Sequence, residues 1–228
     1  MIVDLNELEE GSSFTSDVCI IGAGAAGIAI ALEFIGTNFN VTLLESGGLH
    51  PEADSKRLYE SEIAGLPHAG IHSGRERIFG GTTTTWGGQS LRLDDFDFLP
   101  RDWVPFSGWP LSGRDLDPYY ERAGILLHLG KYLEYNQVCS LFHIAPAEFD
   151  SEKLRLEFSQ WSPRPNFATT YRNALQRASN ISVVLHANVT HIVTNGDGSA
   201  VASARSNPTH TILALCLRIA DRLKQLAK

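Results

Sequence analysis

Three glycines near the N-terminus have the spacing of a phosphate-binding turn. Gly22, Gly24 and Gly27 form the pattern Gly-x-Gly-x-x-Gly, and Ala25 and Ala26 fill its last gap. In such a turn the first glycine permits a tight bend, the second lets the backbone approach a pyrophosphate, and the third lets a helix pack closely against a strand. The phosphates then lie at the positive end of the helix, where amide groups lack partners within the helix. The pattern predicts a dinucleotide site.

A carboxylate follows the glycine turn at the sequence spacing typical of a residue that binds the ribose of a dinucleotide. Glu45 comes eighteen positions after Gly27, at the end of an apolar run, and Ser46 follows it. A carboxylate in that position accepts hydrogen bonds from both ribose hydroxyls and would repel the 2′-phosphate of NADP. The alternative is a glycine-rich turn that binds nothing. The placed carboxylate and the flanking elements favour dinucleotide binding over that alternative.

A second glycine cluster, at residues 79–88, is the most unusual stretch of the chain. Four glycines and four threonines surround one tryptophan there. Such a composition neither forms a regular helix nor alternates as a half-buried strand does. A flexible surface loop is the alternative, but it explains a tryptophan flanked by glycines poorly. Contact with a bound cofactor is the favoured interpretation.

The elements that must position these residues follow from the apolar pattern. Buried strands are expected at 17–21 and 41–45, with a helix over 28–35 between them. This order of strand, turn, helix and strand opens a doubly wound parallel sheet. The remaining expectations are a solvated lead-in at 4–15, irregular structure at 49–74, a helix beginning near 115–118, a half-exposed strand at 154–158, a helix at 169–178, one or two strands within 181–193, and a helical tail at 208–228.

The overall composition is that of a soluble globular protein. The 228 residues are 43% hydrophobic and carry a net charge of −7, which gives no electrostatic reason to bind nucleic acid or an anionic membrane. The N-terminal residues are acidic, unlike a secretory signal, and no apolar run is long enough to span a bilayer. We therefore expect a cytoplasmic protein without a transmembrane segment.

Cysteines and histidines give no sign of a metal or redox centre. The three cysteines lie far apart, which argues against a zinc site, a disulfide framework and the cysteine pair of a disulfide reductase. His68 and His72 are four residues apart, but the glycine between them breaks a helix and no third ligand is near. His186 is expected to face solvent or to make a structural hydrogen bond.

Taken together, these motifs resemble the glucose–methanol–choline (GMC) family of flavin oxidoreductases. The resemblance covers about residues 17–193 and rests on the stretches DVCIIGAGAAGIAIAL, VTLLESGG, RIFGGTTTTWGG, SGWPLSGRDLDPYY and SVVLHANVTHIV. It implies an α/β fold: a Rossmann-type FAD-binding domain with a partial inserted substrate-domain segment. The implied division is an FAD-binding domain at 1–94 and 168–200, an inserted segment at 95–167, and an atypical helical tail at 201–228.

The resemblance implies FAD as the cofactor, because the family places a glycine pair and small hydroxylated residues beside the flavin. Some members carry a histidine that bonds covalently to the flavin where Thr85 stands here, so FAD is expected to be held noncovalently. Val189, expected in a strand, matches a residue whose main-chain amide faces the adenine. The implied cofactor contacts are Gly22, Gly24, Ala25, Ala26, Gly27, Glu45, Ser46, Gly80, Gly81, Thr82, Thr83, Thr85, Trp86, Gly87, Gly88 and Val189.

The implied function is oxidation of an alcohol or sugar hydroxyl, in which a histidine base takes the hydroxyl proton while hydride passes to flavin N5. None of the eight histidines lies where the family has that base, so no catalytic residue is assigned and the chain alone is expected to be inactive. The likeness fades after about Gly198, and the tail is compatible with a short natural form, a truncation or a shifted reading frame.

Two other functions remain open at this point. One is a noncatalytic FAD-binding fragment or module, which the missing base favours. The other is an NAD-linked dehydrogenase of an unrelated family, against which the threonine-rich glycine cluster counts. The expected partner is a small-molecule alcohol or sugar, and the sequence carries no signal for an oligomeric state.

Overall fold

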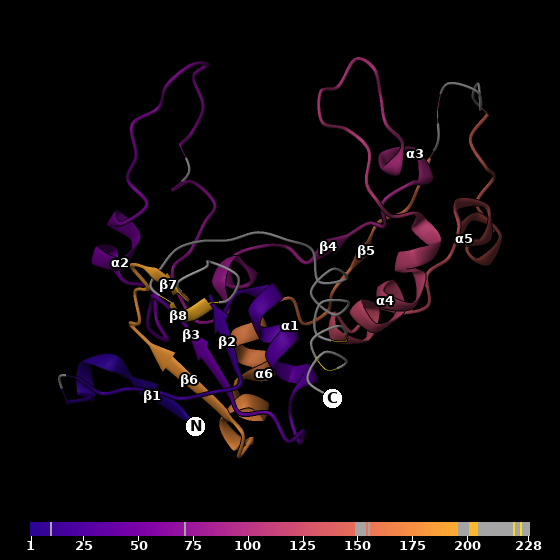
Figure 1. The fold of residues 1–228 in the computed structure, drawn as a ribbon. Helices are drawn as coiled ribbons and strands as arrows, with labels where there is room; N and C mark the ends of the chain where they lie inside the picture. The colour runs from indigo at the N-terminus through magenta and orange to yellow at the C-terminus, as the bar shows by residue number, and fades with distance from the viewer. Residues whose placement is uncertain are drawn as a thin grey trace. The chain divides into compact units, whose positions relative to one another are not determined.

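A computed structural model describes residues 1–9, 11–70, 72–148, 154, 156–195, 201–204, 221 and 224. The chain divides into two compact units (Figure 1). The first consists of residues 1–86 and 165–228, and the second of residues 87–164.

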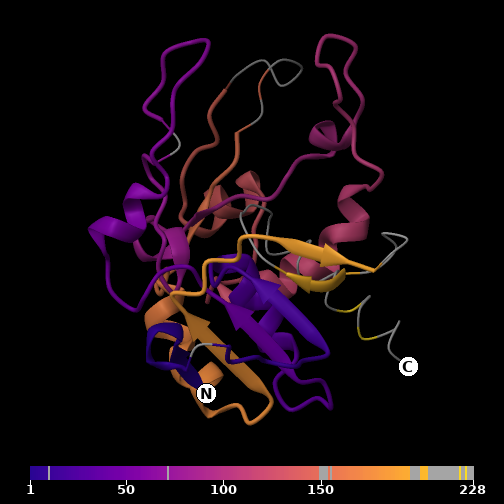
Figure 2. The same ribbon diagram turned by 60° about the vertical axis from the view of Figure 1, so that its left-hand side comes forward.

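A four-stranded parallel sheet forms the centre of the first unit. Its strands are β1 (Ile2–Asp4), β2 (Val18–Ile21), β3 (Val41–Leu44) and β6 (Ile181–Leu185). Their order is β1-β6-β3-β2, and every neighbouring pair is parallel (Figure 2). The two central strands are apolar and almost wholly buried, as expected of strands in a parallel sheet. The predicted α/β class with a parallel sheet is confirmed.

Two helices pack against this sheet and against each other: α1 (Ala25–Glu33), which follows β2, and α6 (Phe167–Arg177), which precedes β6. Helix α1 begins three residues earlier than predicted, because Gly24 caps it and the glycine turn leads directly into its first turn. The core between helices and sheet contains the fully buried Ile28, Phe34, Leu43, Phe167 and Val183.

The predicted solvated lead-in at 4–15 is confirmed for the described residues after Asp4, nearly all of which are exposed, but it is wrong for Asp4 itself. Asp4 ends strand β1, which pairs in parallel with β6. Three residues are too few to show a strand pattern in a sequence, so the pairing is visible only in the structure. The other elements of this unit are the 3₁₀ helices η1 (Leu5–Glu7) and η2 (Gly81–Thr84), helix α2 (Ala53–Arg57), and the antiparallel pair β7 (Ile192–Thr194) and β8 (Val201–Ala204).

The second unit contains short helices and one small antiparallel sheet. Its elements are β4 (Gln89–Ser90), α3 (Asp95–Phe98), α4 (Gly113–Leu126), α5 (Tyr135–Leu141) and β5 (Gln160–Trp161), with β4 paired to β5. Helix α4 begins before the predicted start, because Ser112 and Asp115 form a reciprocal capping box there.

The strand predicted at 154–158 is wrong for its described residues. Leu154 and residues 156–158 have no strand structure, and the strand of this region is β5, two residues later. The apolar residues of the alternating pattern, Leu154, Leu156 and Phe158, are exposed rather than packed on a core. Alternation without a partner strand does not make a sheet.

Most of the helical tail predicted at 208–228 lies outside the described residues. Among the described helices, none is long and apolar enough to cross a membrane.

Candidate dinucleotide-binding site

The first glycine turn joins β2 to α1. Gly22 has a φ of 94°, in the left-handed region that glycine favours, and its amide donates to the Leu44 carbonyl of β3 at 2.7 Å. Helix α1 begins at Ala25, and the amide of Ile28 donates to the Gly24 carbonyl at 3.0 Å. The amides of the first helical turn therefore have no partners within the helix, which is the arrangement that binds phosphate.

Gly27 and Gly24 have different surroundings. A Cβ atom at Gly27 would overlap the Gly22 carbonyl and lie 3.3 Å from Ile20 Cγ2, so α1 packs on β2 only because residue 27 has no side chain. A Cβ atom at Gly24 would meet no other atom within 4 Å. Gly27 therefore serves the packing of the helix, while the backbone at Gly24 stays open to a ligand.

The second glycine cluster packs directly on the first turn. The amide of Gly80 donates to the carbonyl of Ala23 at 2.8 Å. A Cβ atom at Gly81 would lie 2.9 Å from Gly24 Cα, inside van der Waals contact. The structure thus brings the two glycine clusters together, although they are far apart in the sequence.

The threonine hydroxyls of this cluster hold the loop itself. Thr83 Oγ1 donates to the Gly80 carbonyl at 2.6 Å and accepts from the Phe167 amide at 3.1 Å, which fixes the loop to the start of α6. Thr84 Oγ1 and Thr85 Oγ1 each donate to the carbonyl three residues earlier. Their lone pairs remain available to a ligand, but their protons serve the loop.

The end of the cluster runs from the first unit into the second. Trp86 closes the first segment of unit one, and its Nε1–H donates to the Pro165 carbonyl at 2.8 Å. In the second unit a Cβ atom at Gly87 would lie 2.9 Å from the Trp161 ring, and the Gly88 carbonyl accepts from the amide of residue 162 at 3.0 Å. The predicted contact residues are therefore divided between both units.

Glu45 is the buried carboxylate of the site, with 5% of the residue exposed. Its Oε2 accepts from the Ala23 amide at 2.8 Å, and its Oε1 accepts from the Gly47 amide at 2.9 Å and from Ser46 Oγ at 3.3 Å. Burial raises the pKa of the Glu45 carboxyl, while these hydrogen bonds and the charge of Arg77 act to lower it. Glu45 therefore joins the first glycine turn to the turn after β3, a role that the sequence analysis did not anticipate.

Arg77 is a further buried residue beside Glu45 that the sequence analysis missed. Its guanidinium donates to Asn188 Oδ1 and lies over the ring of Tyr59. The sequence signal for Arg77 was its position three residues before the glycine pair Gly80-Gly81. Nothing in the sequence showed that its side chain is buried.

Val189 does not lie in a strand as predicted. Strand β6 ends at Leu185 because His186 takes a φ of 53°, which interrupts the extended backbone. Val189 follows in the loop before β7, close to Ala187, whose amide donates to the Glu45 carbonyl at 2.8 Å. The loop that carries Val189 is thus held at the carboxyl end of β3.

His186 makes the structural hydrogen bonds that the sequence analysis offered as one possibility. Its Nδ1 lies 2.8 Å from Asp4 Oδ2 and its Nε2 lies 2.8 Å from Glu52 Oε1, so the ring bridges β1 and the segment before α2. Hydrogen bonds to these two carboxylates raise the pKa of His186.

The described residues contain no group of three or more metal-ligating side chains positioned to hold a metal ion.

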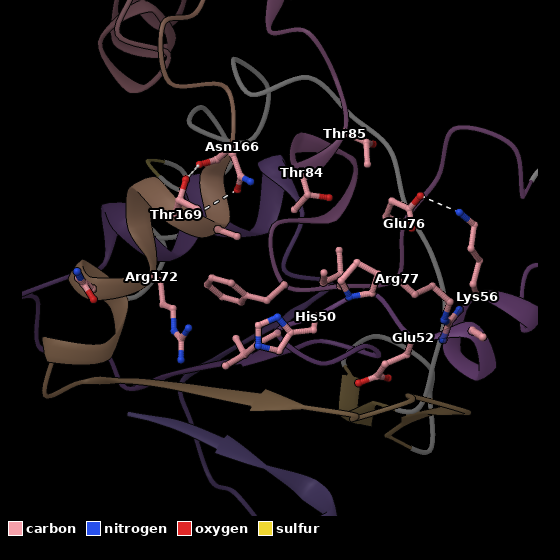
Figure 3. A pocket seen from close by; sticks show the side chains of 17 residues that line it. His50, Glu52, Lys56, Glu76, Arg77, Thr84, Thr85, Asn166, Thr169 and Arg172 are labelled. Carbon is pink, nitrogen blue, oxygen red and sulfur yellow. Dashed lines mark hydrogen bonds and ion pairs between the residues drawn. The ribbon is translucent and has the colours of Figure 1, made fainter.

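A pocket of about 630 Å³ lies beside the glycine cluster, between the segment that follows β3 and the first half of α6. Figure 3 shows Arg172 of α6 at one end and the ion pair of Lys56 with Glu76 (2.9 Å) at the other. Of the predicted cofactor contacts, Thr85 lines this pocket, whereas the first glycine turn and Glu45 are not among its lining residues.

The parallel sheet and its glycine turn define an α/β protein with a Rossmann-like opening unit. No protein-family profile matches the chain. The chain is 32% identical over 117 residues to 6'''-hydroxyparomomycin C oxidase of Streptomyces lividus, a match that covers 46% of the chain and 21% of that protein. It is 28% identical over 131 residues to 2-methyl-1,2-propanediol dehydrogenase of Mycolicibacterium austroafricanum, covering 48% of the chain and 24% of that protein.

Among solved structures, pyridoxine 4-oxidase from Mesorbium loti matches 84% of the chain and 48% of its own length, with 16% identity and a TM-score of 0.45. The matched stretches span less than a quarter of the length of the two curated relatives. The two curated relatives are oxidoreductases by their names, and the likeness to them supports the resemblance to the GMC family of flavin oxidoreductases.

Proposed function

We propose that this chain is the FAD-binding part of a GMC oxidoreductase that oxidises an alcohol or sugar hydroxyl. The packing of the two glycine clusters carries the proposal, through the Gly80–Ala23 hydrogen bond and the contact of Gly81 with Gly24. Because Gly24 and Gly81 have no side chains, the backbone at the start of α1 leaves room for a pyrophosphate. The curated relatives, by their names an oxidase and a dehydrogenase of hydroxylated compounds, support the reaction class.

The residues present fit FAD. The open backbone at Gly24 and the first amides of α1 would hold the pyrophosphate, and Glu45 would bind the ribose through the lone pairs that its two amide bonds leave free. The loop that carries Val189 would face the adenine. Thr85 cannot form the covalent bond that a histidine makes, so FAD would be held noncovalently. Bound FAD would supply the hydride acceptor, its flavin N5.

The contribution of this chain is to bind and orient the cofactor. None of the residues proposed to contact the cofactor is a histidine, so the proposal assigns none of them the role of base for the hydroxyl proton. We therefore expect no alcohol turnover from this chain alone. A noncatalytic FAD-binding module is the second candidate function, and the same observation favours it.

The test of the cofactor is to purify the chain and titrate it with FAD and, separately, with NAD. We expect the visible bands of bound flavin, binding of FAD that NAD does not displace, and release of the flavin into the supernatant on acid precipitation. A folded chain that binds NAD and no flavin would overturn the proposal. Colour that stays in the washed precipitate would refute noncovalent binding.

A further inference from the structure

Arg77 is a buried cation outside the residues assigned to the cofactor, with 5% of the residue exposed. One Nη of its guanidinium donates to Asn188 Oδ1, and its Cζ lies 5.1 Å from the centre of the Tyr59 ring. Its Nε is buried and has no hydrogen-bond partner among the described residues. Burying a cation with so few partners is costly, which indicates a role beyond packing.

The surroundings of Arg77 belong to the ribose and adenine end of the proposed site. A Cβ atom at Gly47 would overlap the Arg77 carbonyl, and the Gly47 amide donates to Glu45 Oε1 at 2.9 Å. Asn188, which the guanidinium holds, is the neighbour of Val189. The backbone of Arg77 therefore supports the turn after β3, and its side chain holds the loop after β6.

We propose that Arg77 is a positioning residue for the ribose and adenine end of the dinucleotide site: it fixes the Val189 loop through Asn188 and places a positive charge beside the buried Glu45 carboxylate. This inference rests on the FAD site proposed above. It assigns Arg77 a function through other residues, without contact to the cofactor.

The charge of Arg77 bears on the protonation of Glu45. Burial raises the pKa of Glu45, and Arg77 is the charged side chain that opposes this effect, beside the neutral amides of Ala23 and Gly47 and the Ser46 hydroxyl. Tyr59 also faces the pair, and burial raises its pKa, so it stays neutral near neutral pH; the charges of Arg75 and Glu76 act on Tyr59 as well. Because a ribose hydroxyl donates more strongly to an ionised carboxylate, loss of Arg77 should weaken binding most at low pH.

The test compares wild type with Arg77→Met and Arg77→Lys, and with the control Arg75→Met, which removes the same charge from a partly exposed residue nearby. FAD dissociation constants are measured from about pH 5 to about pH 8. Arg77→Met should weaken binding about 10- to 100-fold at the acid end and less at the basic end. Arg77→Lys should keep the wild-type pH profile but not the full affinity, because lysine lacks the planar fork. Arg75→Met should match the wild type.

Asn188→Ala provides a second variant in case Arg77→Met does not fold, since Asn188 is exposed. It should weaken FAD binding by the same factor at every pH, because the charge beside Glu45 remains. Carboxyl-carbon NMR of the chain without FAD gives an independent measurement: the pKa of Glu45 should rise in Arg77→Met and stay unchanged in Arg75→Met.

A folded Arg77→Met chain with the affinity and pH profile of wild type overturns the role of Arg77 and leaves the proposed function standing. A weakening that is uniform over the pH range, with the pKa of Glu45 unchanged, also overturns it. If the wild type itself binds no FAD, the proposed function fails first.

Discussion

Gly24 and Gly27 belong to one motif, and the structure predicts opposite consequences for the same substitution at each. In Gly27→Ala the new Cβ would overlap the Gly22 carbonyl, which cannot move freely because the Gly22 amide is bonded to Leu44 of β3. Overpacking typically costs about 1–3 kcal/mol, and a clash with fixed backbone belongs at the upper end of this range. We therefore expect the free energy of unfolding to fall by about 3 kcal/mol.

Gly24→Ala should leave the fold nearly intact, since its Cβ meets no other atom within 4 Å. Because alanine is a poorer N-cap residue than glycine, the free energy of unfolding should fall by only about 0.5–1 kcal/mol. FAD affinity should fall at least about tenfold, which corresponds to about 1.4 kcal/mol, because the methyl group would occupy the approach of the pyrophosphate.

The assay is urea unfolding followed by circular dichroism, together with FAD titration of each folded variant. The two variants have identical composition, and Gly130→Ala, at an open glycine in the second unit, controls for the change itself. Wild-type stability of Gly27→Ala would refute the close contact of α1 with β2. Wild-type FAD affinity of Gly24→Ala would show that no pyrophosphate approaches this turn.

Three further expectations concern Glu45, His186 and reduction of the bound flavin. Glu45→Ala leaves the amides of Ala23 and Gly47 without their acceptor. Because each unsatisfied buried amide costs about 1–3 kcal/mol, the free energy of unfolding should fall by about 2–6 kcal/mol. An unchanged urea midpoint would contradict this expectation. Because its carboxylate partners raise the pKa of His186 above 6.5, the stability that this histidine contributes is full below that pH and is lost as pH rises through the raised value. His186→Asn, which tolerates the positive φ, should remove this decline from urea midpoints measured up to about pH 9, and an equal decline in both proteins would count against the ion pairs. Stopped-flow mixing of the FAD-loaded chain with primary alcohols, aldoses or choline should leave the flavin oxidised, because a missing base costs about 10²–10⁴-fold in rate; rapid bleaching would refute this.

The opening of the sheet could be predicted because its signals are local. Two apolar runs and three spaced glycines determine β2, α1 and β3 within a short stretch of chain, and the structure places them there. Strand β1 could not be predicted in this way, since three residues carry no periodicity and their partner strand lies far along the sequence. The prediction of a strand at 154–158 failed for the opposite reason: its pattern is local, but none of its described residues pairs with another strand.

In the candidate site too, the residues with local sequence signals could be predicted, and the contacts between distant segments could not. The glycines of both clusters and Glu45 were identified from residue types and spacing, but the hydrogen bonds of Glu45 to backbone amides were not. Arg77 escaped notice because its burial depends on Tyr59 and Asn188, which lie far from each other in the sequence. Contacts between distant segments decide which polar side chain is buried, and no local pattern reports them.

The place of β6 between β3 and β1 has a consequence for how the protein folds during synthesis. Strands β2 and β3 can pair as soon as both leave the ribosome, but Val41 must wait for Ile181, 140 residues later, before the other edge of β3 is covered. At about 5–20 residues per second, that edge stays unpaired for about 7–28 s, and β1 cannot join the sheet earlier because its only strand partner is β6 in the described sheet. The nascent chain therefore exposes an apolar strand edge of the kind that chaperones protect, and slower translation would lengthen that exposure.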